Sequence, residues 1–290
     1  MPANTRLIKR RMKSVKNTRK ITKAMELVAA SKMRRAVSAV LGTRPYATLA
    51  LEMISSIGKQ VDTSTHPLLH ESKEVTSVLL VLYTSDRGLA GGFNANMIRK
   101  TYRTIEALGD KVSVDVICVG KRGIQAMRKA NKTIIASFTD LSHQSTFEDI
   151  LPLGKLIITE FSARKYDNVL IAYTDFISAI TQTPTVIPLL PIGKKELVEE
   201  SIEKKTEYTF EPDPMTVLNA ILPRLVETML YQALLESCAS EHSARMMAMR
   251  SASDAASDMI DNLTFTFNQA RQAGITQEIA EISAGKAALE

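Results

Sequence analysis

The chain has few of the residues that mark disulfide-rich, low-complexity or base-stacking proteins. Its 290 residues include two cysteines, 12 glycines, 10 prolines and no tryptophan, and aromatic residues make up 5%. Two cysteines, Cys118 and Cys238, cannot build a disulfide framework, which favours a reducing compartment. The four histidines are scattered, so a structural zinc site is not expected. No apolar run approaches the ~18 residues that a membrane span needs, and we predict no membrane-spanning helix.

Charge is distributed unevenly along the chain, although the formal net charge is only +6. Residues 1–44 carry 13 Lys and Arg and a single acidic residue, Glu26. Residues 45–207 carry 19 residues of each sign, and residues 208–290 carry 5 basic and 11 acidic residues. The oppositely charged ends are predicted to associate with each other, and the basic end to face an acidic partner.

Two long windows contain neither glycine nor proline, between Pro2 and Gly42 and between Pro223 and Gly274. They are rich in Ala, Met, Leu, Lys and Arg, which favour helix. Continuous helices through them would be roughly 58 and 75 Å long, a length typical of coiled coils. Capping chemistry predicts that the helices begin after Asn4-Thr5 and after Asp213-Pro214.

Apolar residues in both windows recur every three or four positions, as in coiled coils. The first window has Ile8, Met12, Val15, Ile21, Met25 and Val28. The second has Met249, Ala252, Ala256, Met259, Leu263, Phe267 and Ala270. We predict that the two helices pair as an antiparallel coiled coil, in which the alanines allow close approach.

The middle of the chain alternates between apolar strand-like runs and helix-like segments, which predicts a largely parallel sheet with helices on its faces. Strands are expected at 75–83, 112–119, 133–138 and 168–174, with helices at about 93–108, 121–131 and 146–165. The proline-containing run 176–192 is predicted to be an edge strand and 194–207 a surface loop. The fold class is therefore α/β: two long terminal helices forming an antiparallel coiled coil, plus a central Rossmann-like domain with a mainly parallel sheet. The predicted parts are 1–60, 70–207 and 208–290.

A glycine-containing loop, TSDRGLAGGFN (84–94), follows a predicted strand and precedes a predicted helix. This is where α/β proteins bind phosphate. However, the G-x-x-G-G spacing of Gly88, Gly91 and Gly92 matches neither the dinucleotide nor the P-loop fingerprint. A structural turn or a protein contact is favoured over nucleotide binding, and no catalytic residue, cofactor site or metal site is predicted on this chain.

A stripe of five lysines on the first helix, spaced by four, three, four and three residues, comprises Lys9, Lys13, Lys16, Lys20 and Lys23. Like charges at this spacing destabilise an isolated helix, so an acidic counterpart is expected. Nucleic acid, anionic lipid and acidic protein loops are the candidates. The scarcity of aromatic residues counts against the first two, and we favour an acidic protein. The basic start also matches a mitochondrial presequence, but the uninterrupted Ala/Met pattern favours a mature helix.

Three stretches together carry a family resemblance: ITKAMELVAASKMRRA (21–36), TSDRGLAGGFN (84–94) and ARQAGITQEIAEISAGKAAL (270–289). With them, the chain resembles the gamma subunits of F-type ATP synthases over essentially its whole length. The resemblance implies a rotor shaft, present in one copy inside a hexamer of three alpha and three beta subunits. It also implies that the α/β domain binds the epsilon subunit and the ring of c subunits, whose ion-driven rotation is coupled to ATP synthesis.

Roles for single residues follow from the same resemblance. It implies coupling positions at Met25, Arg245, Gln272 and Thr276, and an apolar bearing tip at Ile275, Ile279 and Ile282. The lysine stripe would face acidic loops of beta, the glycine loop would serve the fold, and the ATP chemistry would lie in alpha and beta.

The resemblance also indicates a location. The family motif begins near residue 21 and the chloroplast-type insertion is absent, which favours the cytoplasmic side of a bacterial inner membrane, with peripheral attachment through the complex.

Two other hypotheses for the function are a nucleic-acid-binding coiled-coil protein that uses the basic helix, and a dinucleotide enzyme.

Overall fold

The computed structural model describes residues 3–58, 66–70, 72, 74–141, 146–192 and 210–287. The predicted surface loop 194–207 and the predicted part boundaries at 60 and 207 lie outside these residues. The chain divides into two compact units. The terminal unit comprises Met1–Ala30 and Arg245–Glu290, and the central unit comprises Ser31–Ala244.

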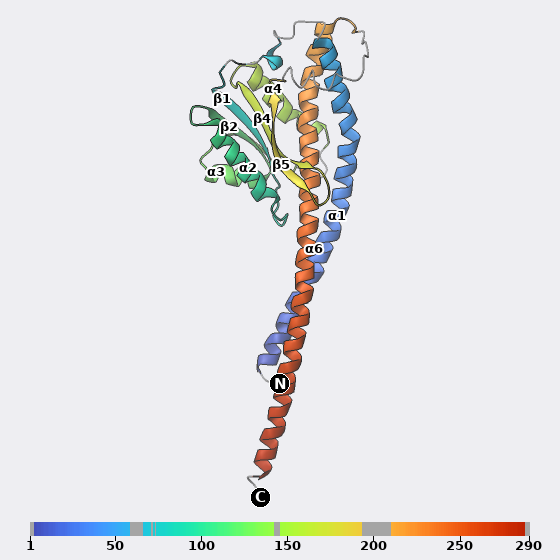
Figure 1. The fold of residues 1–290 in the computed structure, drawn as a ribbon, viewed down its shortest axis with the longest axis vertical. Coiled ribbons are helices and arrows are strands. Elements are labelled where there is room, and N and C mark those ends of the chain that lie inside the picture. The colour runs from blue at the N-terminus through green and yellow to red at the C-terminus, as the bar shows by residue number, and fades with distance from the viewer. Residues whose placement is uncertain are drawn as a thin grey trace. The chain divides into compact units, whose positions relative to one another are not determined.

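Two long helices, α1 (Ala3–Gly58) and α6 (Pro214–Ala287), contribute to both units (Figure 1). The predicted start of α6 is confirmed, because Asp213 Oδ1 accepts hydrogen bonds from the backbone N–H groups of Met215 (3.0 Å) and Thr216 (2.9 Å). The predicted start of α1 is wrong. Asn4 and Thr5 already lie inside the helix, and Thr5 is buried instead of acting as a cap.

In the terminal unit the two helices pair in antiparallel fashion. Arg19 Nη1 lies 3.4 Å from Ser257 Oγ, whereas earlier residues of α1 line a groove with Phe267. A set of buried and half-buried positions of α6 recurs in steps of four and three, which is the heptad pattern of a coiled coil. These positions are Met249, Ser253, Ala256, Ile260, Leu263, Phe267, Ala270 and Gly274.

Parts of the predicted seam are wrong. Ile21 and Val28 are 61% and 57% exposed, and Met259 is 43% exposed. Their neighbours Thr22, Ala29 and Ile260 are buried instead. In α1 the small Thr22 and Ala29 side chains let the helices come close, and the larger Ile21 and Val28 point outward while the seven-residue repeat is kept.

The sheet lies in the central unit and confirms the predicted fold class. Its strand order is β3-β2-β1-β4-β5, and neighbours are parallel except β4 and β5, which are antiparallel. The proline-containing strand forms one edge, as predicted. The strands are β1 (Ser77–Tyr83), β2 (Ser113–Val119), β3 (Ile134–Phe138), β4 (Asn168–Phe176) and β5 (Gln182–Leu190).

Helices cover both faces of this sheet (Figure 1). Leu80 and Leu82 of β1 pack with Met97 of α2 (Phe93–Leu108) and Met127 of α3 (Lys121–Lys129). The alternate residues of β1 belong to the core that contains α4 (Leu151–Ser162) and the first turns of α6. Two 3-10 turns, Pro67–Leu69 and Glu148–Ile150, complete the described elements. The sheet is thus the middle of three layers, with α6 as a core helix of the domain.

Candidate interaction interface

The five lysines of the stripe are exposed on α1. Lys23 pairs with Glu26 of the next turn at 2.9 Å. Lys9, Lys13, Lys16 and Lys20 have no ion pair with any residue that the structure describes. Because the α6 segment of the terminal unit does not neutralise these four ammonium groups, they are available to an acidic partner.

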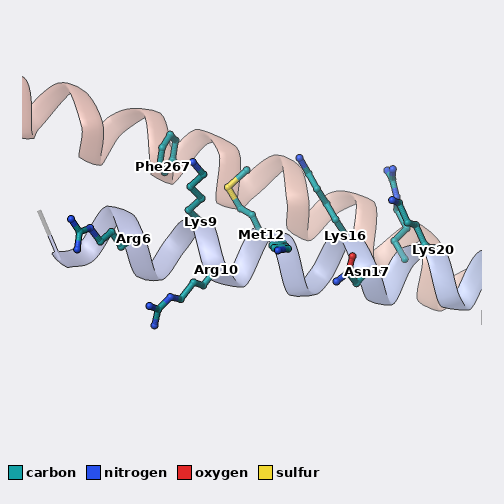
Figure 2. A pocket seen from close by; sticks show the side chains of 10 residues that line it. Arg6, Lys9, Arg10, Met12, Lys16, Asn17, Lys20 and Phe267 are labelled. Atoms are coloured by element: carbon teal, nitrogen blue, oxygen red, sulfur yellow. The ribbon is translucent and has the colours of Figure 1, made fainter. Parts of the chain in front are cut away.

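A groove of about 850 Å³ runs along this face of the terminal unit (Figure 2). In Figure 2, Met12 points toward α6 and Phe267 points toward α1, so both contribute apolar surface to the groove. Arg10 points away from α6. The groove therefore combines a dense positive charge with an apolar strip, which suits a chain segment with acidic and apolar residues. Its seven cationic residues are Arg6, Lys9, Arg10, Lys13, Lys16, Arg19 and Lys20.

Large apolar side chains of α1 are exposed in the stretch of sequence around the half-buried Met25. Ile21 and Val28, seven residues apart on one side of the helix, are 61% and 57% exposed, and Leu27 is 61% exposed on another side. Exposed apolar side chains of this size are candidates for contact with another protein. Sequence reasoning missed this surface because it assigned Ile21 and Val28 to the helix seam.

The four coupling candidates fall into two separate places. Because Arg19 contacts Ser257 and the helices are antiparallel, Met25 lies opposite residues near 251 of α6. Measured along the helix axis, this level is within about 10 Å of Arg245. Gln272 lies about 30 Å further along α6 at 1.5 Å per residue. The structure therefore brings Met25 near Arg245 but does not bring either of them near Gln272.

Gln272 and Thr276 are both exposed and one helical turn apart. Thr276 Oγ1 donates a hydrogen bond to the backbone carbonyl of Gln272 at 3.1 Å. The Gln272 side-chain amide has no hydrogen bond to any described residue. These two side chains therefore form a shared polar patch, with the amide of Gln272 open to an external group.

The predicted apolar tip has no covering element among the described residues. From Ile275 to Lys286 every residue of α6 is exposed, and Gly274 is the last buried one. Ile275, Ile279 and Ile282 are 50%, 59% and 74% exposed and lie on one side of the helix. Within the part of the chain that the structure describes, no other element covers the apolar stripe at this end of α6.

The glycine loop of the central unit is held by hydrogen bonds of its own. Ser85 and Asn94 bond each other across it, and the Asp86 carboxylate accepts the backbone N–H groups of Lys121 (3.0 Å) and Asp140 (2.9 Å). Leu89 and Gly91 have positive φ values of 62° and 54°. The loop is therefore hydrogen-bonded to the neighbouring turns at Lys121 and Asp140, and the Asp86 carboxylate already has partners within the chain.

Neither a metal cluster nor a membrane span is found in the described part of the chain. No three His, Cys, Asp or Glu side chains there gather as ligands. No helix in the same residues has an apolar stretch long enough to cross a bilayer.

The sequence profile described as "ATP synthase" matches residues 4–289, nearly the whole chain. A curated relative named ATP synthase gamma chain, from Roseiflexus castenholzii, is 44% identical over 291 residues, covering 100% of this chain and 99% of the relative. The chain belongs to the ATP synthase gamma-chain family. Another of the same name, from Dehalococcoides mccartyi, is 43% identical, covering 99% of both chains.

Solved structures agree with this family. A chain of the Tetrahymena thermophila mitochondrial ATP synthase, described as central stalk and c ring, is 27% identical with a TM-score of 0.61. The match covers 80% of this chain and 99% of that one. A chain of the Euglena gracilis mitochondrial enzyme, 19% identical with a TM-score of 0.67, covers 99% of this chain and 94% of its own, and shows the fold alone.

Proposed function

We propose that this chain is the central rotor shaft of an F-type ATP synthase, and that it couples rotation of the c ring to the conformational cycle of the catalytic beta subunits. Full-length identity of 44% to a gamma chain carries the proposal. The paired helices of the terminal unit, with their exposed apolar and basic surfaces, supply the physical parts that such a shaft needs. The relatives give no support to the nucleic-acid hypothesis or the dinucleotide hypothesis.

The partners follow from the surfaces. The basic groove fits acidic loops of beta, and the apolar stripe of Ile275, Ile279 and Ile282 fits an apolar sleeve made by alpha and beta. Met25, Arg245, Gln272 and Thr276 are the proposed coupling contacts. One copy would act per three alpha and three beta subunits, with epsilon and the c ring bound to the central domain.

The chemistry of ATP stays with alpha and beta in this proposal, and this chain contributes mechanical coupling only. An asymmetric shaft biases each beta subunit differently at a given angle, which is coupling between sites through distinct contacts. Attachment to the membrane is peripheral, on the cytoplasmic side of a bacterial inner membrane.

Reconstitution tests the proposal. The chain is mixed with cognate alpha and beta subunits, and the complex is isolated by size-exclusion chromatography and assayed for ATP hydrolysis. One copy per three alpha–beta pairs, with hydrolysis that depends on the chain, supports the rotor role. A chain that elutes alone and adds no activity with cognate partners contradicts it.

A further inference from the structure

A stretch of α6 inside the central unit is buried on all sides although it is largely polar. The eleven consecutive residues 233–243 are all buried, so three turns of the helix present no exposed face. A helix buried all round is ordinarily apolar. Here six of the eleven are polar: Glu236, Ser237, Ser240, Glu241, His242 and Ser243.

Three walls enclose this buried segment (residues 233–243). On one side Leu235 and Ala239 pack with Val40 of α1. On a second side, Leu234, Ser237 and Cys238 line a small space together with residues from both ends of the glycine loop, Thr84, Asp86 and Phe93. The third wall is the β4–β5 hairpin.

The hairpin wall is joined to α6 by three serines, Ser237, Ser240 and Ser243, which we term the serine ladder. The Thr174 N–H donates to Ser237 Oγ at 3.1 Å, and Ser240 Oγ donates to the Thr174 carbonyl at 3.1 Å. Ser243 Oγ donates to the Ala179 carbonyl at 2.5 Å. The steps of three residues keep the hydroxyls on one side of the helix.

These bonds fall where the sheet leaves backbone groups open. Pairing of β1 with β4 ends at Leu82–Ala172, so Thr174 lies beyond it. The hydroxyls of α6 therefore complete the hydrogen bonding of β4 in place of a strand.

We infer that the serine ladder is the grip through which torque passes between the α/β domain and α6. Apolar packing resists separation of a helix from its neighbours, and its interlocking side chains also oppose rotation of the helix about its own axis. Directional hydrogen bonds to a fixed sheet backbone add resistance to that rotation. From Ser243, α6 continues unbroken to Ala287, so torque held at the ladder reaches the terminal unit. This inference rests on the proposed rotor function.

The test uses the assembled membrane-bound enzyme with the variant S237A/S240A/S243A. Ser251→Ala, an exposed serine of the same helix, is the matched control. We expect the rate of ATP synthesis driven by an ion gradient to fall about fivefold or more, because the net free energy of one typical hydrogen bond corresponds to a factor of about five. ATP hydrolysis without load should stay near the wild-type rate. Hydrogen exchange at the Thr174 amide should also accelerate about fivefold.

Each outcome has a distinct meaning. Wild-type ATP synthesis by the triple variant, with faster exchange at Thr174, overturns the grip and leaves the rotor proposal intact. A wild-type chain that neither assembles nor supports synthesis overturns the rotor proposal itself. If the triple variant does not assemble, Ser243→Ala alone provides the same comparison, because it leaves the two bonds of Thr174 in place.

Discussion

The Asp167 side chain is hydrogen-bonded to Ser77, the first residue of β1. One carboxylate oxygen, Oδ2, accepts both the backbone N–H of Ser77 (2.9 Å) and its hydroxyl (3.1 Å). The same oxygen accepts the N–H and hydroxyl of Thr76, and Ser72 Oγ donates to the other oxygen. The hydrogen bond from the Thr76 N–H, followed by the others, holds the pKa of Asp167 far below its usual value of 3.8.

This pKa predicts a defined pH dependence for Asp167→Asn. A carboxylate with a depressed folded-state pKa stabilises the protein above its unfolded pKa, and this stabilisation is lost as pH falls. We expect Asp167→Asn to lower the free energy of unfolding by about 2 kcal/mol at pH 7. The difference from wild type should shrink below pH about 4.

Urea titrations between pH 7 and pH 3 measure this difference, with Asp110→Asn at an exposed position as the control. A difference that stays constant over the whole range would show that the stabilisation does not come from the ionised carboxylate.

Gly120 supports a second prediction. Its φ is +96°, and a Cβ built there would lie 2.1 Å from the backbone oxygen of Thr84. Gly109 also has a positive φ, of +79°, but a Cβ there meets nothing within 4 Å. Gly109→Ala should therefore cost only the backbone strain of about 1–3 kcal/mol, and Gly120→Ala about 4 kcal/mol because the backbone must also shift. Equal costs in thermal unfolding would show that the turn relaxes freely.

The sheet could be predicted from the sequence because its signals are local. The run of apolar residues in β1 and the three prolines between 176 and 192 fix a central strand and an edge strand without reference to any partner. It was harder to predict which residues of each long helix face the other helix. Ile21 and Val28 fit a helical stripe as well as Thr22 and Ala29 do, and only the packing of the second helix decides between them.

The serine ladder also could not be predicted from the sequence. A polar run such as Glu236–His242 usually indicates an exposed helix face, and its burial depends on a hairpin about 60 residues away. The coupling roles of Met25, Arg245, Gln272 and Thr276 stay predictions, because they concern surfaces of other subunits.

Met25→Lys tests the first of the coupling positions. Met25 is half-buried one helical turn from the exposed Val28, so a lysine adds charge next to exposed apolar surface. We expect ATP hydrolysis to persist while ATP-driven ion pumping falls about tenfold, the effect of roughly 1.4 kcal/mol. Met25→Leu should pump normally. Normal pumping by Met25→Lys would remove Met25 from the coupling contacts.

Four lysines of the stripe, which form no ion pair with any described residue, predict an electrostatic contribution to assembly. Replacing Lys9, Lys13, Lys16 and Lys20 with Gln should weaken the association of the chain with alpha and beta and flatten its salt dependence, because the attraction is screened within about 10 Å at 0.1 M salt. Lys111→Gln with Lys129→Gln, at exposed positions of the central unit, is the control. The association constant is measured by titration at two salt concentrations. If the stripe faces a partner, the association constant of the variant should depend less on salt than that of the wild type, and if the stripe is solvated the two dependences should be equal.

The apolar end of α6 should matter for function but not for folding. Ile275→Ser, Ile279→Ser and Ile282→Ser together remove apolar surface that no described element covers. The thermal midpoint of the isolated chain should stay within about a degree, whereas rotation in the complex should become irregular. A large loss of stability in the isolated chain would mean that these residues are covered within the chain.

The most direct test of the rotor account is single-molecule rotation. The chain is assembled with cognate alpha and beta subunits fixed to a surface, and a bead is attached to an introduced cysteine on the exposed face of α3. The account predicts that adding ATP drives continuous rotation of the bead in one direction. A correctly assembled, ATP-hydrolysing complex whose bead stays still or moves only by diffusion would contradict it.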